Sequence, residues 1–109
     1  MRFLIALLFA SSAHASYFDG NLLLSKMRGS SGEQLQALGY IQGVHDAFHE
    51  LTVCNPPNVT GGQVFEMVKN YLENVPATRH FSADVIIERI LANSWPCKSQ
   101  KNNSSQKNL

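Results

Sequence analysis

Two histidines with a carboxylate beside them are the residues of this chain with the clearest capacity for chemistry. His45 and His49 are four residues apart, and Asp46 follows the first of them. Side chains at this spacing share one face of a helix, where two imidazoles can bind one metal ion. His80 could add a third ligand. The alternative is a solvated polar face, which we favour because the helical wheel places both histidines on that face.

Covalent and acid-base catalysis have less support. The chain has no Gly-x-Ser-x-Gly sequence, the turn that presents a nucleophilic serine. Its cysteines are expected to be oxidised, and an oxidised sulfur cannot attack as a thiolate. Glu66 and Glu73 fall two turns apart on a polar helix face, and nothing beyond their carboxylates suggests an acid-base pair. We therefore expect a protein that is not an enzyme and uses no cofactor.

The chain has only two cysteines, Cys54 and Cys97, and each follows a predicted helix. In an exported protein they indicate one disulfide, and two free thiols are the alternative. Closing this loop would contribute about 4 kcal/mol in the chain-entropy model. Because the two Cα atoms must come within about 7 Å, the C-terminal ends of the two helices are expected to meet.

Residues 1–15 have the pattern of a secretory signal. Arg2 provides the positive start, Phe3–Ala10 is an apolar run too short to span a bilayer, and Ala13-His14-Ala15 is an A-x-A cleavage site. We expect cleavage after Ala15 and a mature protein in the periplasm. An uncleaved amphipathic anchor is the alternative.

The mature chain is expected to be one small domain, residues 16–97, followed by a disordered polar tail, residues 98–109. The whole chain has a net charge of +1, but residues 16–97 carry five Lys and Arg against eight Asp and Glu. This mildly acidic domain lacks the basic patch of a nucleic-acid-binding protein. We expect neither nucleic acid nor, after cleavage of the signal, a membrane as a partner.

Apolar periodicity, capping residues and prolines predict an all-α fold. The expected helices are Gly20–Lys26, a long helix from the Gly29–Gly32 loop to about Leu51, Gly61–Asn74, and a last helix capped by Ser82 and ending near Ser94. The capping boxes are Ser30 with Glu33 or Ser31 with Gln34, and Thr60 with Gln63. With the disulfide, these spans predict a small bundle with an up-down-up core and a short first helix alongside.

The long helix has an apolar arc and two interior glycines. The arc consists of Ala37, Tyr40, Ile41, Val44, Ala47, Phe48 and Leu51. Gly39 and Gly43 each cost about 1 kcal/mol relative to alanine, which indicates a packing reason. We favour packing against the short first helix over a dimer or partner contact. The Asn55–Asn58 segment, with two prolines, is either a simple connector or a rigid loop that presents residues to a partner.

The chain resembles the Rap/Tai-type immunity proteins of bacterial type VI secretion, over nearly all of the mature sequence up to Cys97. The motifs that carry the resemblance, in order, are Gly20-Asn21-Leu22-Leu23, Gly39-Tyr40-Ile41-x-Gly43-Val44-x-Asp46-Ala47, Cys54-x-Pro56, Val59-Thr60, Tyr71-Leu72, Pro76 with Arg79-His80, and Trp95-Pro96-Cys97. The chain departs from the family pattern at a second cysteine pair, because its first helix has no cysteine and Ala37 stands at the other position.

The resemblance implies a small, helical, periplasmic protein, often dimeric, that binds a toxic effector and is not an enzyme. Some members block a peptidoglycan amidase, so we expect occlusion of an effector active site and a possible homodimer. The candidate partner-binding residues are His45, Asp46, His49, Glu50, Asn55, Asn58, Arg79 and His80.

Two other functions remain open from the sequence. A small periplasmic chaperone active under acid stress would also carry an export signal and one disulfide, and its histidines could respond to protonation. A histidine-based metal carrier would retain metal through purification. A chaperone would suppress aggregation of unrelated proteins at low pH, whereas an immunity protein would bind one cognate partner at neutral pH.

Overall fold

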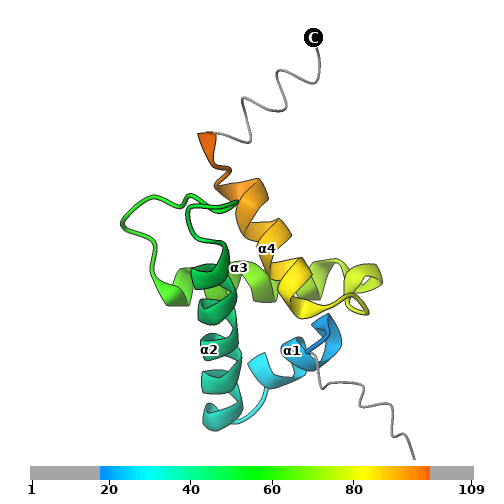
Figure 1. Ribbon diagram of the computed structural model, residues 1–109. Helices are drawn as coiled ribbons and strands as arrows, with labels where there is room; N and C mark the ends of the chain where they lie inside the picture. The colour runs from blue at the N-terminus through cyan, green and yellow to red at the C-terminus, as the bar shows by residue number, and fades with distance from the viewer. Residues whose placement is uncertain (1–17, 99–109) are drawn as a thin grey trace, which may run out of the picture.

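The computed structural model describes residues 18–98. Within this range lie α1 (Gly20–Met27), α2 (Ser31–Phe48), α3 (Gly61–Asn74), the short 3-10 helix η1 (Pro76–Thr78) and α4 (Ala83–Ser94). The predicted all-α fold with four helices is therefore confirmed (Figure 1). The predicted signal at residues 1–15 and all but the first residue of the predicted tail lie outside the described residues. None of the described helices combines the length and apolar character that crossing a membrane requires.

Local capping explains where most helices begin. A capping box, in which side chain and backbone at the helix start bond reciprocally, is present at α2 and at α3, and at α2 it is the first of the two predicted alternatives. The pairs are Ser30 with Glu33 at α2 and Thr60 with Gln63 at α3. Ser82 stands at the N-cap of α4, as expected, but its side chain caps no backbone N–H and bonds the carboxylate of Asp84 instead.

The predicted disulfide is formed and brings two helix ends together. Cys54 and Cys97 are bonded with a Cα–Cα distance of 5.0 Å. The Cys54 N–H also donates to the Trp95 carbonyl at 2.8 Å, so the backbones after α2 and α4 are joined directly. In Figure 1, α3 crosses behind α2 and α4 and contacts both, so its return path is oblique rather than antiparallel.

All four helices contribute to one apolar core. The buried residues are Leu23, Leu24 and Met27 of α1; Ala37, Ile41 and Val44 of α2; Val64, Val68 and Leu72 of α3; and Ala83, Ile86, Ile87 and Leu91 of α4, with Val53 from the turn after α2. No polar or charged residue is buried within the described range. The core is thus a plain hydrophobic one, and all the charged residues of the described chain lie at least partly at its surface.

The start of α1 is fixed against the segment that precedes α4. The Gly20 and Asn21 N–H groups donate to the carbonyls of Phe81 and Arg79, at 3.1 and 3.0 Å. A Cβ on Gly20 would lie 2.8 Å from the Arg79 carbonyl oxygen and 2.9 Å from its Cα. Only glycine allows this close approach of two backbones, which explains the residue at this position.

Tyr40 of α2 packs beside this contact. Its ring centroid is 4.6 Å from that of Phe18, the residue that leads into α1. Partial burial raises the pKa of the Tyr40 phenol, and the negative charge of Asp84 raises it further. The phenol therefore stays neutral at ordinary pH and contributes packing rather than charge.

Two expectations for the long helix were wrong. The helix ends at Phe48 instead of Leu51, and Leu51 is 65% exposed rather than part of the core. Gly39 and Gly43 do not pack against α1, because both are exposed and a Cβ on either would meet nothing within 4 Å. Their cost in helix propensity is therefore not offset by any contact within the described chain.

Candidate partner-binding site

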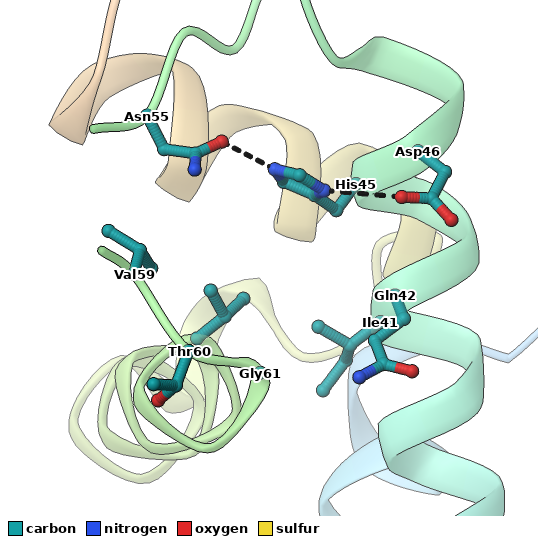
Figure 2. Close-up of a pocket in the computed structure, with 9 residues that line it drawn as sticks. Ile41, Gln42, His45, Asp46, Asn55, Val59, Thr60 and Gly61 are labelled. Carbon is teal, nitrogen blue, oxygen red and sulfur yellow. Dashed lines mark hydrogen bonds and ion pairs between the residues drawn. The ribbon is translucent and has the colours of Figure 1, made fainter. Parts of the chain in front are cut away.

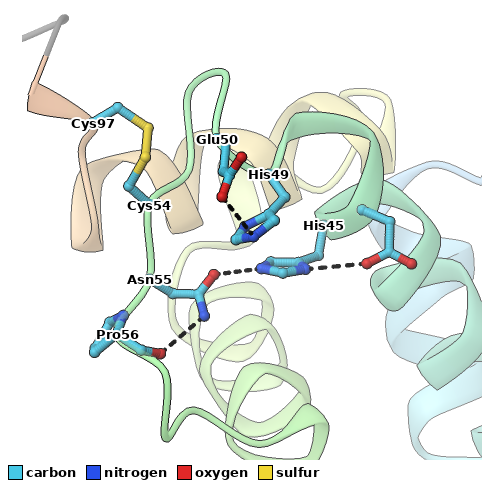
Figure 3. Close-up of polar contacts among 8 residues, drawn as sticks. His45, His49, Glu50, Cys54, Asn55, Pro56 and Cys97 are labelled. Carbon is cyan, nitrogen blue, oxygen red and sulfur yellow. Dashed lines mark hydrogen bonds and ion pairs between the residues drawn. A yellow bond between two sulfur atoms is a disulfide. The ribbon is translucent and has the colours of Figure 1, made fainter.

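Six of the eight predicted site residues belong to the C-terminal end of α2 or to the loop that follows it. We call this region the polar end, and it consists of His45, Asp46, His49, Glu50, Asn55 and Asn58. Four belong to the last turn of α2 and the two residues after it, and Asn55 and Asn58 belong to the loop that follows the disulfide. Figure 3 shows His45 beside Asn55 of the loop and beside the His49 side chain. The disulfide thus anchors the loop beside the helix.

A hydrogen bond between His45 and Asn55 joins the helix to the loop. His45 Nε2 lies 2.6 Å from Asn55 Oδ1, and Asn55 Nδ2 donates to the Pro56 carbonyl at 3.1 Å (Figure 3). The second bond fixes which way the amide points, so its oxygen faces the histidine. His45 must therefore donate from Nε2, and this ring nitrogen carries the proton.

The other nitrogen of His45 faces a carboxylate. Its Nδ1 is 3.5 Å from Asp46 Oδ1, and the Asp46 side chain is 82% exposed. When Nδ1 also carries a proton, the ring is a cation and pairs with Asp46 while its hydrogen bond to Asn55 is kept. Most of the Asp46 carboxylate remains free to meet another molecule in either state.

A second histidine and carboxylate extend the same surface. The His49 ring lies 5.1 Å from the His45 ring, centroid to centroid, and His49 Nε2 is 3.8 Å from Glu50 Oε1. The Glu50 side chain is 81% exposed. Contacts between such exposed groups add little stability, so this pair arranges charge at the surface rather than holding the fold.

A pocket of about 220 Å³ opens beside these residues, between α2 and the start of α3 (Figure 2). It is lined by Ile41, Gln42, His45, Asp46, Asn55, Val59, Thr60, Gly61 and Val64. Isoleucine and valine side chains supply its apolar lining, and the other residues add amide, imidazole and carboxylate groups. The hollow has room for one side chain, and its lining offers hydrogen-bonding groups.

The remaining two predicted site residues lie elsewhere, between α3 and α4. α4 is 12 residues long and separates this segment from the disulfide end by about 18 Å of helix. The Arg79 guanidinium donates to the carbonyls of Leu72 and Glu73 and thereby caps α3. His80 is exposed, with its ring 4.2 Å from that of Phe81.

This arrangement brings no third ligand to the metal site considered for His45 and His49. His45 and His49 lie side by side, but His80 is at the other end of α4. The described residues contain no group of three or more histidine, cysteine, aspartate or glutamate side chains placed to hold a metal ion. The polar end therefore provides hydrogen-bonding and charged groups at a fixed surface, which suits recognition of a protein.

Comparison with known families assigns the chain to one of them. The model of the family described as Rap1a immunity proteins matches residues 19–97, and the chain belongs to this family. Its members are inhibitors without enzymatic activity, so the protein is not an enzyme, and membership implies inhibition of a cognate type VI secretion effector. The matched range coincides with the helical part of the chain and ends at Cys97. No curated protein matches the chain.

Proposed function

We propose that the protein works in the periplasm, where it inhibits one cognate type VI effector, a peptidoglycan amidase, by covering the effector's active site. The observation that carries this proposal is the polar end, where exposed carboxylates lie on a scaffold fixed by a disulfide and by the bond between His45 and Asn55. Family membership supports inhibition over the chaperone alternative. The disulfide is in keeping with an oxidising compartment.

Inhibition at this surface requires only tight binding. A rigid surface loses little conformational entropy when it docks, so more of the contact energy appears as affinity. The Asp46 and Glu50 carboxylates would meet basic or hydrogen-bond-donating groups around the effector cleft, and the pocket beside His45 would receive one effector side chain. Substrate is then excluded by volume, without any reaction on the inhibitor.

Arg79 and His80 form a second candidate contact within this proposal. His80 is exposed and free to touch a partner, but the Arg79 guanidinium already bonds two carbonyls of α3. For this reason we consider the polar end the main contact surface for the effector. A homodimer is also part of the proposal, and the outer face of α2 around Gly39 and Gly43 is open enough for a second copy to approach closely.

The proposal is tested by titrating the mature protein against the secreted product of the neighbouring gene and measuring that product's lytic activity. Binding with loss of lysis is the expected result. A folded, active product that is not bound would overturn the pairing. Suppression of the aggregation of unrelated proteins at low pH would instead support the chaperone alternative.

Charge reversal at the polar end tests its role in binding. The double variant Asp46→Lys/Glu50→Lys should lower affinity for the effector at least about tenfold, because both exposed carboxylates would become like charges facing basic groups. Thermal stability should change by less than about 0.5 kcal/mol. The control Glu66→Lys/Glu88→Lys makes the same change in net charge on α3 and α4. Equal affinity of the two double variants would exclude the polar end as the interface.

A further inference from the structure

Glu50, just past the end of α2, has a backbone conformation that most residues avoid. Its φ is 65°, and no other residue in the described range, glycines included, has a positive φ. Glycine or asparagine commonly occupies this position after a helix, because a longer side chain is sterically disfavoured there. The side chain of Glu50 is 81% exposed and packs against no core residue that would offset the strain. A strained residue of this kind points to a functional requirement.

The turn that contains Glu50, His49–Val53, is held in one conformation. The Phe48 carbonyl accepts hydrogen bonds from the N–H groups of residues 51–53, at 3.0 to 3.2 Å. The Glu50 N–H donates to the Val53 carbonyl at 2.9 Å, and Val53 is completely buried. The disulfide follows immediately. The turn is therefore preorganised and would dock without a large loss of conformational entropy.

Leu51 is the apolar residue that this turn exposes. It is 65% exposed, although the residues on both sides of the turn are anchored in the fold. A single exposed leucine needs no explanation by itself. Here it stands next to the strained carboxylate, at the tip of a fixed turn. The Asp46 carboxylate and the negative end of the α2 dipole lie at the same end of the helix.

We propose that the turn His49–Val53 is the element that enters the effector, with Leu51 filling an apolar hollow and the Glu50 carboxylate pairing with a cationic side chain beside it. This inference rests on the proposed inhibition and names the chemistry of the complementary surface. Leu51 supplies the apolar contact that is buried in the complex, and the Glu50 carboxylate fixes the orientation of the turn on the effector. The left-handed backbone of Glu50 is what places the two side chains next to each other at the tip.

The test measures affinity and thermal stability of single variants with the secreted product of the neighbouring gene as the probe. Leu51→Ala should weaken binding at least about tenfold, as expected for an anchor residue, with unchanged thermal stability. Glu50→Gly should also weaken binding, by about tenfold, while the protein melts at the same or a higher temperature because glycine relieves the left-handed strain. Lower affinity without lower stability separates a contact role from a structural one.

Leu35→Ala is the matched control, because Leu35 is 67% exposed on the N-terminal half of α2. Its affinity should stay within about twofold of wild type, as for a residue outside the contact. If wild type binds and Leu51→Ala binds equally well, the role of the turn is wrong while the proposed inhibition stands. If wild type does not bind the folded, active probe, the proposed pairing is wrong and this inference falls with it.

Discussion

The two ends of α4 carry similar residues that do different things. At its C-terminal side, the polar end has histidines and carboxylates that bond each other or the loop and keep most of their charge exposed. At its N-terminal side, where α1 meets the segment from Arg79 to Ala83, polar groups bond the backbone instead. We call this second region the α1–α4 junction. We therefore expect the polar end to tolerate loss of charge without unfolding, and the junction to lose stability when its contacts are removed.

The difference also concerns how each region is held. The polar end depends on a covalent link and the fixed turn beside it. The junction depends on backbone hydrogen bonds and on the close approach that Gly20 permits. A region held by a crosslink can present unusual side chains at its surface, because local stability does not depend on them. This contrast makes separate predictions for the two ends.

Removing the disulfide should lower stability more than any of the other substitutions, and the loss should be concentrated at the polar end. The variant Cys54→Ser/Cys97→Ser is expected to lose about 4 kcal/mol of unfolding free energy, because the unfolded chain regains the entropy of an open loop. Denaturant unfolding measures this loss. Should the variant fail to fold, wild type measured with and without reductant gives the same quantity.

The location of the effect distinguishes the two ends. Amide hydrogen exchange should accelerate more at Leu51–Cys54 than at Gly20 and Asn21, which the junction protects. Equal acceleration at both ends would mean that the disulfide supports the whole fold evenly. The contrast between the two regions would then be wrong.

Arg79 and His80 provide the next test, because they are neighbours with opposite expected behaviour. Arg79→Ala should cost about 2 kcal/mol of unfolding free energy, since two carbonyls of α3 lose a charged donor. His80→Ala should change stability by less than about 0.5 kcal/mol, because the side chain is exposed. Thermal unfolding measures both.

Affinity for the effector completes this test. Both variants should bind like wild type if the polar end alone is the interface. Strong loss of affinity in His80→Ala, without loss of stability, would instead place the interface at the junction. If only Arg79→Ala lost affinity, the cause would be unfolding, and the affinity would fall as the melting temperature of the variant falls.

Local signals predicted most of the fold. The capping boxes, the prolines and the apolar periodicity gave helices whose ends lie within a few residues of those observed, and the two cysteines gave the disulfide. These features are decided within one turn of the chain or by a single covalent bond. The oblique path of α3 depends on how side chains from three helices pack, which periodicity does not encode.

The misses have physical causes that no local pattern reveals. Leu51 fits the apolar arc of α2, but the helix stops at Phe48 because the chain turns back to bury Val53 and reach the disulfide. For the candidate site, sequence reasoning selected histidines and carboxylates that the structure places at the polar end, and their role in binding stays a prediction. It did not distinguish Arg79, whose guanidinium is engaged with α3, from residues that are free.

Substituting the glycines of α2 should give small gains in stability. At protein concentrations too low for a second copy to bind, Gly39→Ala and Gly43→Ala should each raise the unfolding free energy by about 1 kcal/mol, because alanine is the better helix former. The added Cβ would meet nothing within 4 Å. Gly20→Ala at the junction is the control of opposite sign and should cost about 1 to 3 kcal/mol, because its Cβ would lie 2.8 Å from a backbone oxygen. Denaturant unfolding at several protein concentrations measures all three. A loss of stability in Gly39→Ala that grows with concentration would show that a second copy covers this face, and glycine would then be needed for close approach between two chains.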